Sequence, residues 1–135
     1  MNKEIVEVRK SFESSPFFSL VGFEVLYFEE GNVKIKLPVT NKLLNANETL
    51  HGGVHATMLD IIMGMTIRSV SKTRCTTINL DIHYIAPSTK GEIYATGKIL
   101  KQGYKIVTAE AELIGEDGQL LAKGVGTFKL LRNEV

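Results

Sequence analysis

The stretch from Val54 to Ile67 constrains the fold more than any other part of the chain. Its apolar residues lie on every side of a helical wheel: Val54, Ala56, Met58, Leu59, Ile61, Ile62, Met63, Met65 and Ile67. A helix that is apolar all round is buried inside a domain, whereas a surface helix carries a single apolar stripe. Gly52 and Gly53 mark its beginning, and Arg68 near its end suits the negative end of the helix dipole. The remaining elements must therefore be built around one long central helix.

The segments on either side of this helix have the two-residue period of β-strands. In the segment that follows it, one face carries Ile78, Leu80, Ile82 and Tyr84, and the other carries Thr77, Asn79, Asp81 and His83. Further strands are predicted at 23–30, 33–37, 91–101, 104–114 and 120–131, with turn residues between them. Ile5, Val8 and Phe12 have helical spacing, so a short amphipathic helix is expected at the N-terminus. This order predicts an α+β domain in which a meandering antiparallel sheet wraps around one central helix.

Length and composition indicate one ordinary globular domain. The chain has 135 residues, 44% hydrophobic and 23% charged, which fits a single domain over 1–135 with an N-terminal helical segment at 1–16. Sixteen basic residues against fifteen acidic ones give a formal charge of +1, so we expect neither nucleic acid nor a membrane as partner. The N-terminus lacks the apolar core of a signal peptide, no stretch is long enough to span a membrane, and Cys75 is the single cysteine. We therefore expect a cytoplasmic protein without an internal disulfide.

Asp60 is the most informative residue for function. It is the only acid between Glu48 and Asp81, and it lies inside the apolar helix. A carboxylate in apolar surroundings is costly unless another group pairs with it or the protein uses it chemically. A structural role, on a helix face that reaches solvent or caps a neighbouring loop, is the alternative that the residue alone leaves open.

The start of the same helix, at Gly52 and Gly53, is a second candidate feature. The first amides of a helix have no internal partner and carry the positive end of the dipole. Two glycines let a substrate approach this backbone closely, so the helix start could bind an oxyanion or polarise a carbonyl. A flexible helix cap is the alternative interpretation.

The spacing of these two features predicts a shared site. Gly52 and Asp60 are eight residues apart, which is about 12 Å along a helix axis. A catalytic acid and an oxyanion donor must both lie within roughly 3 Å of one reacting group. If both take part, Asp60 of one subunit must face the helix start of another, and a two-fold axis would create two equivalent sites.

The stretch from Asn45 to Asp60, NANETLHGGVHATMLD, resembles the signature of hotdog-fold acyl-CoA thioesterases, particularly the PaaI-like (phenylacetic acid degradation) group. That signature combines a loop Asn with His-Gly-Gly and an acid nine residues after the His. Thr77, the segment 84–87 and Gly126-Thr127-Phe128 fall where the family has similar residues, so the resemblance covers the chain from about Phe17 onward. It implies a hotdog fold and hydrolysis of an acyl-CoA thioester to a carboxylic acid and coenzyme A.

The resemblance also implies roles for individual residues. Asp60 would be either the general base that activates water or the nucleophile that attacks the thioester, and both roles stay open. The Gly52 amide would polarise the thioester carbonyl. Asn45 and His51 would order the loop and hold the substrate or the attacking water, and Thr77 would place a hydroxyl near the acid.

The residues expected to bind substrate are Gly53, Leu59, Met63, Lys101 and Lys105. The two lysines are substitutes for an Arg that many relatives carry where this chain has Tyr104, so they are the expected contacts to the coenzyme A phosphates. We expect a homodimer or homotetramer, and no metal or redox cofactor, because a thioester is already an activated acyl group. A non-catalytic acyl-CoA-binding regulatory module and a hotdog 3-hydroxyacyl thioester dehydratase are the alternatives.

Other reactive side chains have simpler interpretations. His51 and His55 are four residues apart, a spacing found in zinc sites, but Gly52 stands where a metalloprotease helix needs Glu, so no metal site is expected. We interpret His55 as a packing or interface residue and His83 as solvated or interfacial. Cys75 has no activating partner in the sequence, so a thiol nucleophile is not expected.

Overall fold

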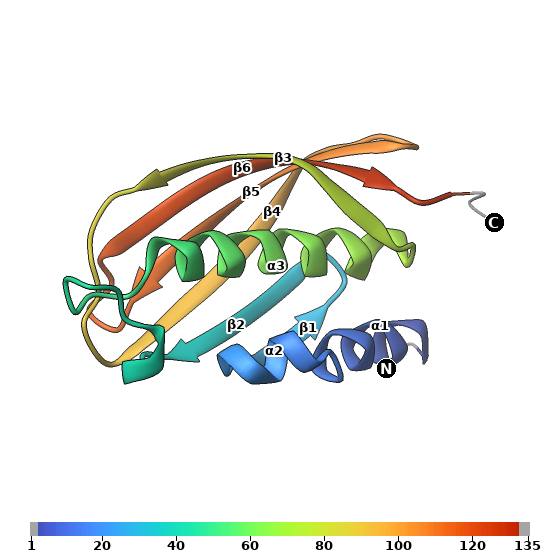
Figure 1. The fold of residues 1–135 in the computed structure, drawn as a ribbon. Coiled ribbons are helices and arrows are strands. Elements are labelled where there is room, and N and C mark those ends of the chain that lie inside the picture. The colour runs from blue at the N-terminus through green and yellow to red at the C-terminus, as the bar shows by residue number, and fades with distance from the viewer. Residues whose placement is uncertain (1–2, 133–135) are drawn as a thin grey trace.

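A computed structural model describes residues 3–132 as three α-helices, one short 3-10 helix and six strands (Figure 1). In chain order they are α1 (Lys3–Glu13), α2 (Pro16–Val21), β1 (Glu24–Glu29), β2 (Asn32–Pro38), η1 (Asn41–Leu43), α3 (Gly52–Ser71), β3 (Cys75–Tyr84), β4 (Glu92–Gln102), β5 (Ile106–Gly115) and β6 (Leu120–Leu130). The long helix and all six strands predicted from the sequence are present. Across residues 3–132, no helix combines the length and the apolar character needed to cross a membrane.

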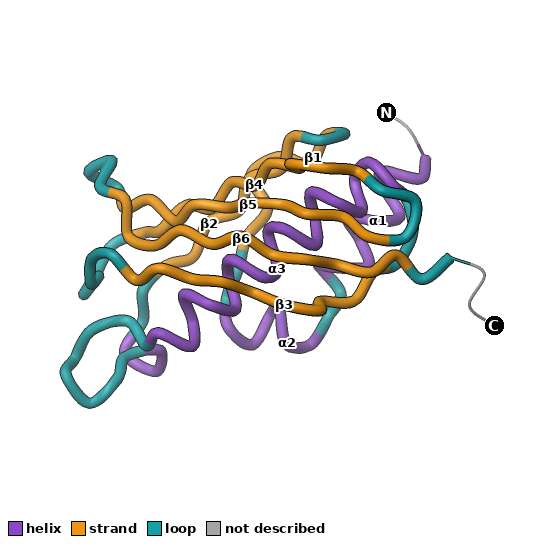
Figure 2. The backbone as a smooth tube through the Cα atoms, turned by 90° about the horizontal axis from the view of Figure 1, so that it is seen from above, coloured by secondary structure: helices purple, strands orange, loops and turns teal. Residues whose placement is uncertain are grey.

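All six strands form one antiparallel sheet in the order β1-β2-β4-β5-β6-β3, and the sheet curves over α3 (Figures 1 and 2). The expected α+β architecture of a sheet wrapped around a central helix is confirmed. The order departs from a simple meander, because β3 does not pair with β4, the next strand along the chain. It lies at the edge of the sheet beside β6, so β2 and β4 pair directly and both α3 and β3 are inserted between them in sequence.

The core lies between α3 and the concave face of the sheet. Met58, Leu59, Ile62 and Met63 of α3 are fully buried. They pack against alternate residues of the strands, and β5 alone contributes Val107, Ala109, Ala111 and Leu113. The helix comes very close to β4 at Gly97, where an added Cβ would lie 2.7 Å from the Thr66 hydroxyl oxygen. A small residue at this position lets the helix pack closely against the curved sheet.

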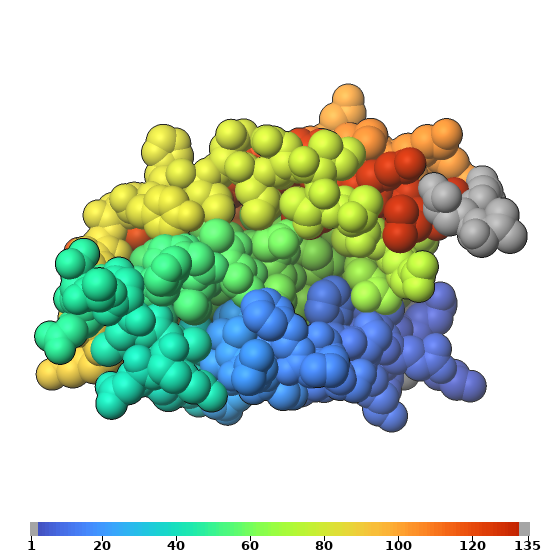
Figure 3. Space-filling model, in the orientation of Figure 1, coloured from blue at the N-terminus to red at the C-terminus, as the bar shows by residue number. Residues whose placement is uncertain are grey.

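One side of α3 is less covered than the all-round apolar pattern predicts. Thr57, Asp60, Ile61 and Arg68 are only half-buried. Figure 3 shows α3 at the surface, in green, between the N-terminal helices and β3. The central helix therefore presents an open stripe in the single chain, and Asp60 lies on it.

Two helices precede the sheet where the sequence predicted one. The expected segment is confirmed as α1, whose Ile5 and Val8 are buried; residues 1 and 2 of that segment lie outside the described residues. The six-residue α2 was not predicted, because its apolar run is too short to show a helical period. Pro16 begins α2, and Gly22, with a φ of 104°, ends it in a left-handed conformation.

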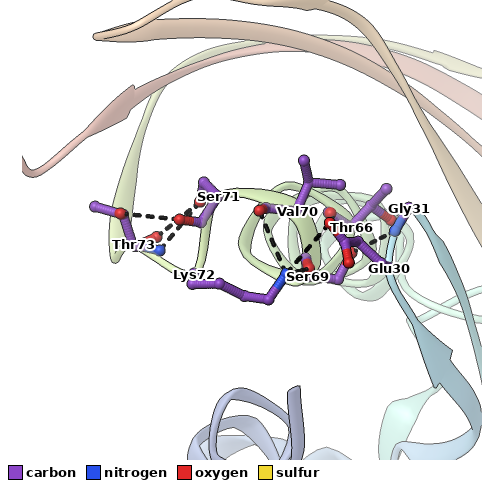
Figure 4. A network of polar contacts seen from close by, with 8 residues as sticks. All are labelled: Glu30, Gly31, Thr66, Ser69, Val70, Ser71, Lys72 and Thr73. Atoms are coloured by element: carbon purple, nitrogen blue, oxygen red, sulfur yellow. Dashed lines mark hydrogen bonds and ion pairs between the residues drawn. The ribbon is translucent and has the colours of Figure 1, made fainter. Parts of the chain in front are cut away.

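A polar network anchors the C-terminal end of α3 to the turn between β1 and β2 (Figure 4). The Ser69 hydroxyl donates to the Thr66 carbonyl at 2.6 Å and accepts from the Gly31 amide at 2.9 Å. The Lys72 ammonium donates to the Ser69 carbonyl at 2.6 Å and lies 3.6 Å from the Glu30 carboxylate. A cation at this position stabilises the carbonyl end of the helix dipole.

Strand β3 contains a bulge that changes which side chains face the helix. Its pairing with β6 shifts between Thr77 and Asn79, so Ile78 is the extra residue. Leu80 and Ile82 pack against the core, as the alternation predicted. The prediction that Ile78 shares their face and Thr77 the opposite one is wrong, because the bulge reverses the alternation at this point.

Candidate active site

The Asp60 side chain is hydrogen-bonded across the open stripe of α3 to strand β3. The Thr77 hydroxyl donates to Asp60 Oδ1 at 2.7 Å. The bulge at Ile78 makes this contact available, since it turns Thr77 toward the helix. One carboxylate oxygen is thereby fixed, while the other accepts no hydrogen bond from residues 3–132. The resemblance had suggested a hydroxyl near the acid, and the geometry agrees with it.

A pocket of about 180 Å³ opens beside this pair. Its lining comes from α1, α3, β3 and β6 and comprises Phe12, Asp60, Ile61, Gly64, Arg68, Cys75, Thr77 and Phe128. Burial raises the pKa of the Cys75 thiol to about 11, and Arg68 opposes this shift only in part. The thiol is therefore protonated at neutral pH and unsuited to nucleophilic attack. We call this hollow the acid pocket.

The start of α3 leaves one backbone donor unused. His51 caps the helix, and its Nδ1 accepts from the Gly53 amide at 2.7 Å, while its carbonyl accepts from the amides of Val54 and His55. Within residues 3–132, no group accepts from the Gly52 amide. Of the two glycines that the sequence singled out, only Gly52 therefore has an N–H free to bind a ligand.

The loop before α3 is held by Asn45. Its side-chain oxygen accepts from the backbone amides of Asn47, at 2.8 Å, and Thr49, at 3.1 Å. The amide of His51 in turn donates to the Leu43 carbonyl at 2.9 Å. These bonds fix the backbone that presents His51 and Gly52, as expected if Asn45 and His51 order the loop.

A second hollow, of about 280 Å³, lies at the Gly52 end of α3. We call it the amide pocket; it is lined by Thr49, Leu50, Gly52, His55, Tyr84, Ile85, Ala86 and Pro87. The His55 ring stacks on that of Tyr84 with centroids 6.0 Å apart. His55 is only 4% exposed, and neither ring nitrogen has a hydrogen-bond partner among residues 3–132. Burial lowers the pKa of His55, so the imidazole is neutral at neutral pH.

The single chain does not bring Asp60 and Gly52 together. They line separate pockets, and because they are eight residues apart the helix separates them by about 12 Å. Leu59 and Met63, expected at the substrate site, are fully buried and line neither pocket, because they lie on the sheet-facing side of α3.

Lys101 and Lys105 are exposed near the turn between β4 and β5, and they also line neither pocket. Sequence reasoning did not assign Gly64 or the amide-pocket role of Tyr84. A glycine inside an apolar helix was the available signal for Gly64.

Comparison with known proteins identifies relatives with this fold. The family described as the thioesterase superfamily matches residues 47–122. Acyl-coenzyme A thioesterase 13 of Mus musculus is 30% identical over 135 residues, covering 96% of each chain. The crystal structure of zebrafish thioesterase superfamily member 2 superimposes with a TM-score of 0.82 at 29% identity, covering 92% of this chain and 94% of the other. The E. coli PaaI protein from the phenylacetic acid degradation operon has a TM-score of 0.87 at 17% identity, covering 94% and 93%, and supports the fold alone.

Proposed function

The chain belongs to the thioesterase superfamily and is a thioester hydrolase with a hotdog fold, and we propose that it hydrolyses acyl-CoA to a carboxylic acid and coenzyme A. The observation that carries the proposal is the 2.7 Å hydrogen bond that holds the Asp60 carboxylate in the lining of a pocket. The name of the mouse relative supports acyl-CoA as the substrate class. We expect the reaction to need no metal or redox cofactor, and the protein to work in the cytoplasm.

Asp60 promotes hydrolysis of the thioester by one of two routes, as a general base or as a nucleophile. As a general base it takes a proton from water while the hydroxide adds to the carbonyl carbon, and the proton passes to the departing sulfur as the C–S bond breaks. As a nucleophile its oxygen bonds to the carbonyl carbon and expels the thiolate, and water then hydrolyses the resulting anhydride. Thr77 orients the carboxylate in both routes.

The Gly52 amide polarises the carbonyl. Negative charge develops on the carbonyl oxygen when the tetrahedral intermediate forms, and a free N–H at the start of a 20-residue helix stabilises it. The hydrogen bonds of Asn45 and His51 keep this amide in place, since they fix the loop on which it depends.

Two subunits supply one site through the edge strand β3. Within residues 3–132 this strand pairs with β6 alone, and the apolar side chains of Ile78 (55%), Tyr84 (57%) and Ile85 (53%), on the strand or directly after it, are exposed. Thr77 near its start contacts Asp60, and the Tyr84 ring at its end lies 3.4 Å from where a Cβ on Gly52 would be. If two β3 strands pair antiparallel about a two-fold axis, each chain's Asp60 end meets the partner subunit's Gly52 end. A homodimer is the smallest assembly that completes the site, and a homotetramer would contain two such dimers.

Substitutions at the two half-sites test this arrangement. Asp60→Asn should abolish most thiol release from acyl-CoA, whereas Asp81→Asn, on the exposed face of β3, serves as the matched control. Gly52→Pro removes the free N–H at a helix position that tolerates proline, and Gly52→Ala keeps the N–H with a Cβ in the same place. The proline variant should be slower than the alanine variant by roughly a hundredfold or more, the usual value of an oxyanion donor.

Mixing the two inactive chains tests whether the site is shared. A dimer of one Asp60→Asn chain and one Gly52→Pro chain contains one intact site. Random exchange should therefore restore about a quarter of the wild-type activity. Proven exchange without recovery would refute the shared site. Tight acyl-CoA binding by the wild type without thiol release would instead identify a binding module.

A further inference from the structure

Gly64 creates the space in the acid pocket. It lies one helical turn after Asp60 on the same side of α3, and an added Cβ would meet no atom within 4 Å. A glycine inside a helix costs about 1 kcal/mol relative to alanine. The helix therefore carries an unfavourable residue at the place where a side chain would narrow the pocket.

Arg68 is the cation at the other end of this pocket. It follows Gly64 by one more turn, so Asp60, Gly64 and Arg68 form a single row along α3. Helical side chains lean toward the N-terminus, which brings the Arg68 guanidinium back over the turn that contains Gly64. Its position is fixed by the Phe12 ring, whose centroid is 5.0 Å away and which also lines the pocket.

Within residues 3–132, no carboxylate forms an ion pair with the Arg68 guanidinium. Its buried Nε also has no hydrogen-bond partner in the part of the chain that the structure describes. Glu4, Glu7 and Lys72 line a separate hollow on its other side. Burial lowers the pKa of Arg68, and the nearby Arg74 adds to this shift. A half-buried guanidinium whose Nε donor is unpaired is suited to a carboxylate, which arginine binds through two parallel hydrogen bonds.

We propose that the acid pocket receives the acyl group and that Arg68 binds a carboxylate at its far end, so that the preferred substrates are CoA monoesters of short dicarboxylic acids. This inference rests on the proposed hydrolysis at Asp60. The pocket, at about 180 Å³, is close in size to the engineered cavity of about 150 Å³ that holds the six carbons of benzene. Acyl groups of about four to six carbons therefore fit. The scissile carbonyl lies at Asp60, and the second carboxylate lies toward Arg68, away from the negative charge of Asp60.

The experiment compares glutaryl-CoA with pentanoyl-CoA, which differ in whether the acyl chain ends in a carboxylate or a methyl group. The wild type should favour glutaryl-CoA in kcat/KM by at least tenfold. Arg68→Met, which keeps length without charge, should lower that ratio at least tenfold, and Arg68→Lys should lower it less. Arg74→Met is the matched control, because Arg74 is exposed and lines neither pocket. A wild type that hydrolyses pentanoyl-CoA as well as glutaryl-CoA would overturn the inference.

The coenzyme A phosphates are the other anions that Arg68 could bind in the same substrate. Pantetheine thioesters lack the nucleotide phosphates, so they distinguish binding of the acyl carboxylate from binding of these phosphates. If Arg68 binds the acyl carboxylate, the glutaryl preference persists with glutaryl- and pentanoyl-pantetheine. An Arg68→Met defect that affects both CoA esters equally and disappears with pantetheine esters would overturn the inference. If Arg68→Met does not fold, inhibition of the wild type by glutarate and by pentanoate provides the comparison, and equal inhibition counts against it. If no thioester is hydrolysed, the proposed function fails, and calorimetric binding of the two CoA esters to the wild type still tests Arg68.

Discussion

Replacing Gly64 by alanine should stabilise the protein by about 1 kcal/mol, because alanine is the better helix former by about that amount. The new methyl group meets no atom within 4 Å, so no steric cost opposes this gain. For a chain of 135 residues, 1 kcal/mol corresponds to a rise in Tm of about 4 °C. Urea unfolding followed by circular dichroism, at one fixed protein concentration, measures the change.

Gly97→Ala is the matched control on the opposing strand. There the added Cβ would lie 2.7 Å from the Thr66 hydroxyl oxygen and 3.3 Å from the Ile62 carbonyl oxygen, so this substitution should destabilise. A Gly64→Ala variant that loses stability, or that behaves like Gly97→Ala, would refute the statement that Gly64 borders open space. The same methyl group narrows the acid pocket, so greater stability should be accompanied by slower hydrolysis of the longer acyl groups.

Three further perturbations probe other parts of the site. Thr77→Val removes the hydroxyl that donates to Asp60 and should lower kcat about 10- to 100-fold, which corresponds to the roughly 1.5–3 kcal/mol of a hydrogen bond to a charged group. Thr77→Ser keeps a hydroxyl and should lower kcat far less. Equal losses of kcat in the two variants would refute an orienting role for Thr77. Because burial lowers the pKa of His55 in the folded state, the unfolded state binds more protons, so the free energy of unfolding should fall as pH drops below the ordinary value of 6.5. His55→Phe should flatten that slope in urea titrations at several pH values, and an unchanged slope would assign it to other groups. Burial raises the pKa of the Cys75 thiol from 9.0 to about 11, so less of the reactive thiolate is present in the folded protein. At pH 8 the folded protein should therefore react with iodoacetamide about a hundredfold more slowly than the urea-unfolded chain. Equal rates would contradict the burial of Cys75.

The central helix was predictable because its signal is local. Apolar residues on every side of Val54–Ile67 require burial whatever surrounds them, and the strands on either side have clear two-residue periods. The sheet order was not predictable in the same way. Whether β3 pairs with β4 or with β6 depends on contacts between distant segments, and the periodicity of a single strand carries no information about its neighbour.

In the candidate site, too, local sequence signals were predictive and features that depend on packing were not. Asp60 stood out as a lone acid in an apolar helix and Gly52 as the start of that helix, and the family resemblance implied roles for His51, Asn45 and Thr77. The bulge at Ile78 left no mark in the alternation of apolar and polar residues, so the side to which Thr77 points could not be derived from it. Arg68 suited the helix dipole, and only the packing of Phe12 beside it reveals that its guanidinium borders the acid pocket.

The placement of β3 beside β6 imposes an order on folding during translation. When β3 has been synthesised, its partner is still absent, because Leu120, the first residue of β6, comes 36 residues after Tyr84. At roughly 5–20 residues per second, the ribosome needs about two to seven seconds to reach the start of β6. Throughout that interval the nascent chain holds a complete apolar helix whose sheet is only partly made. Chaperones that bind exposed apolar segments therefore have a defined window, and slowing synthesis between β4 and β6 would lengthen it.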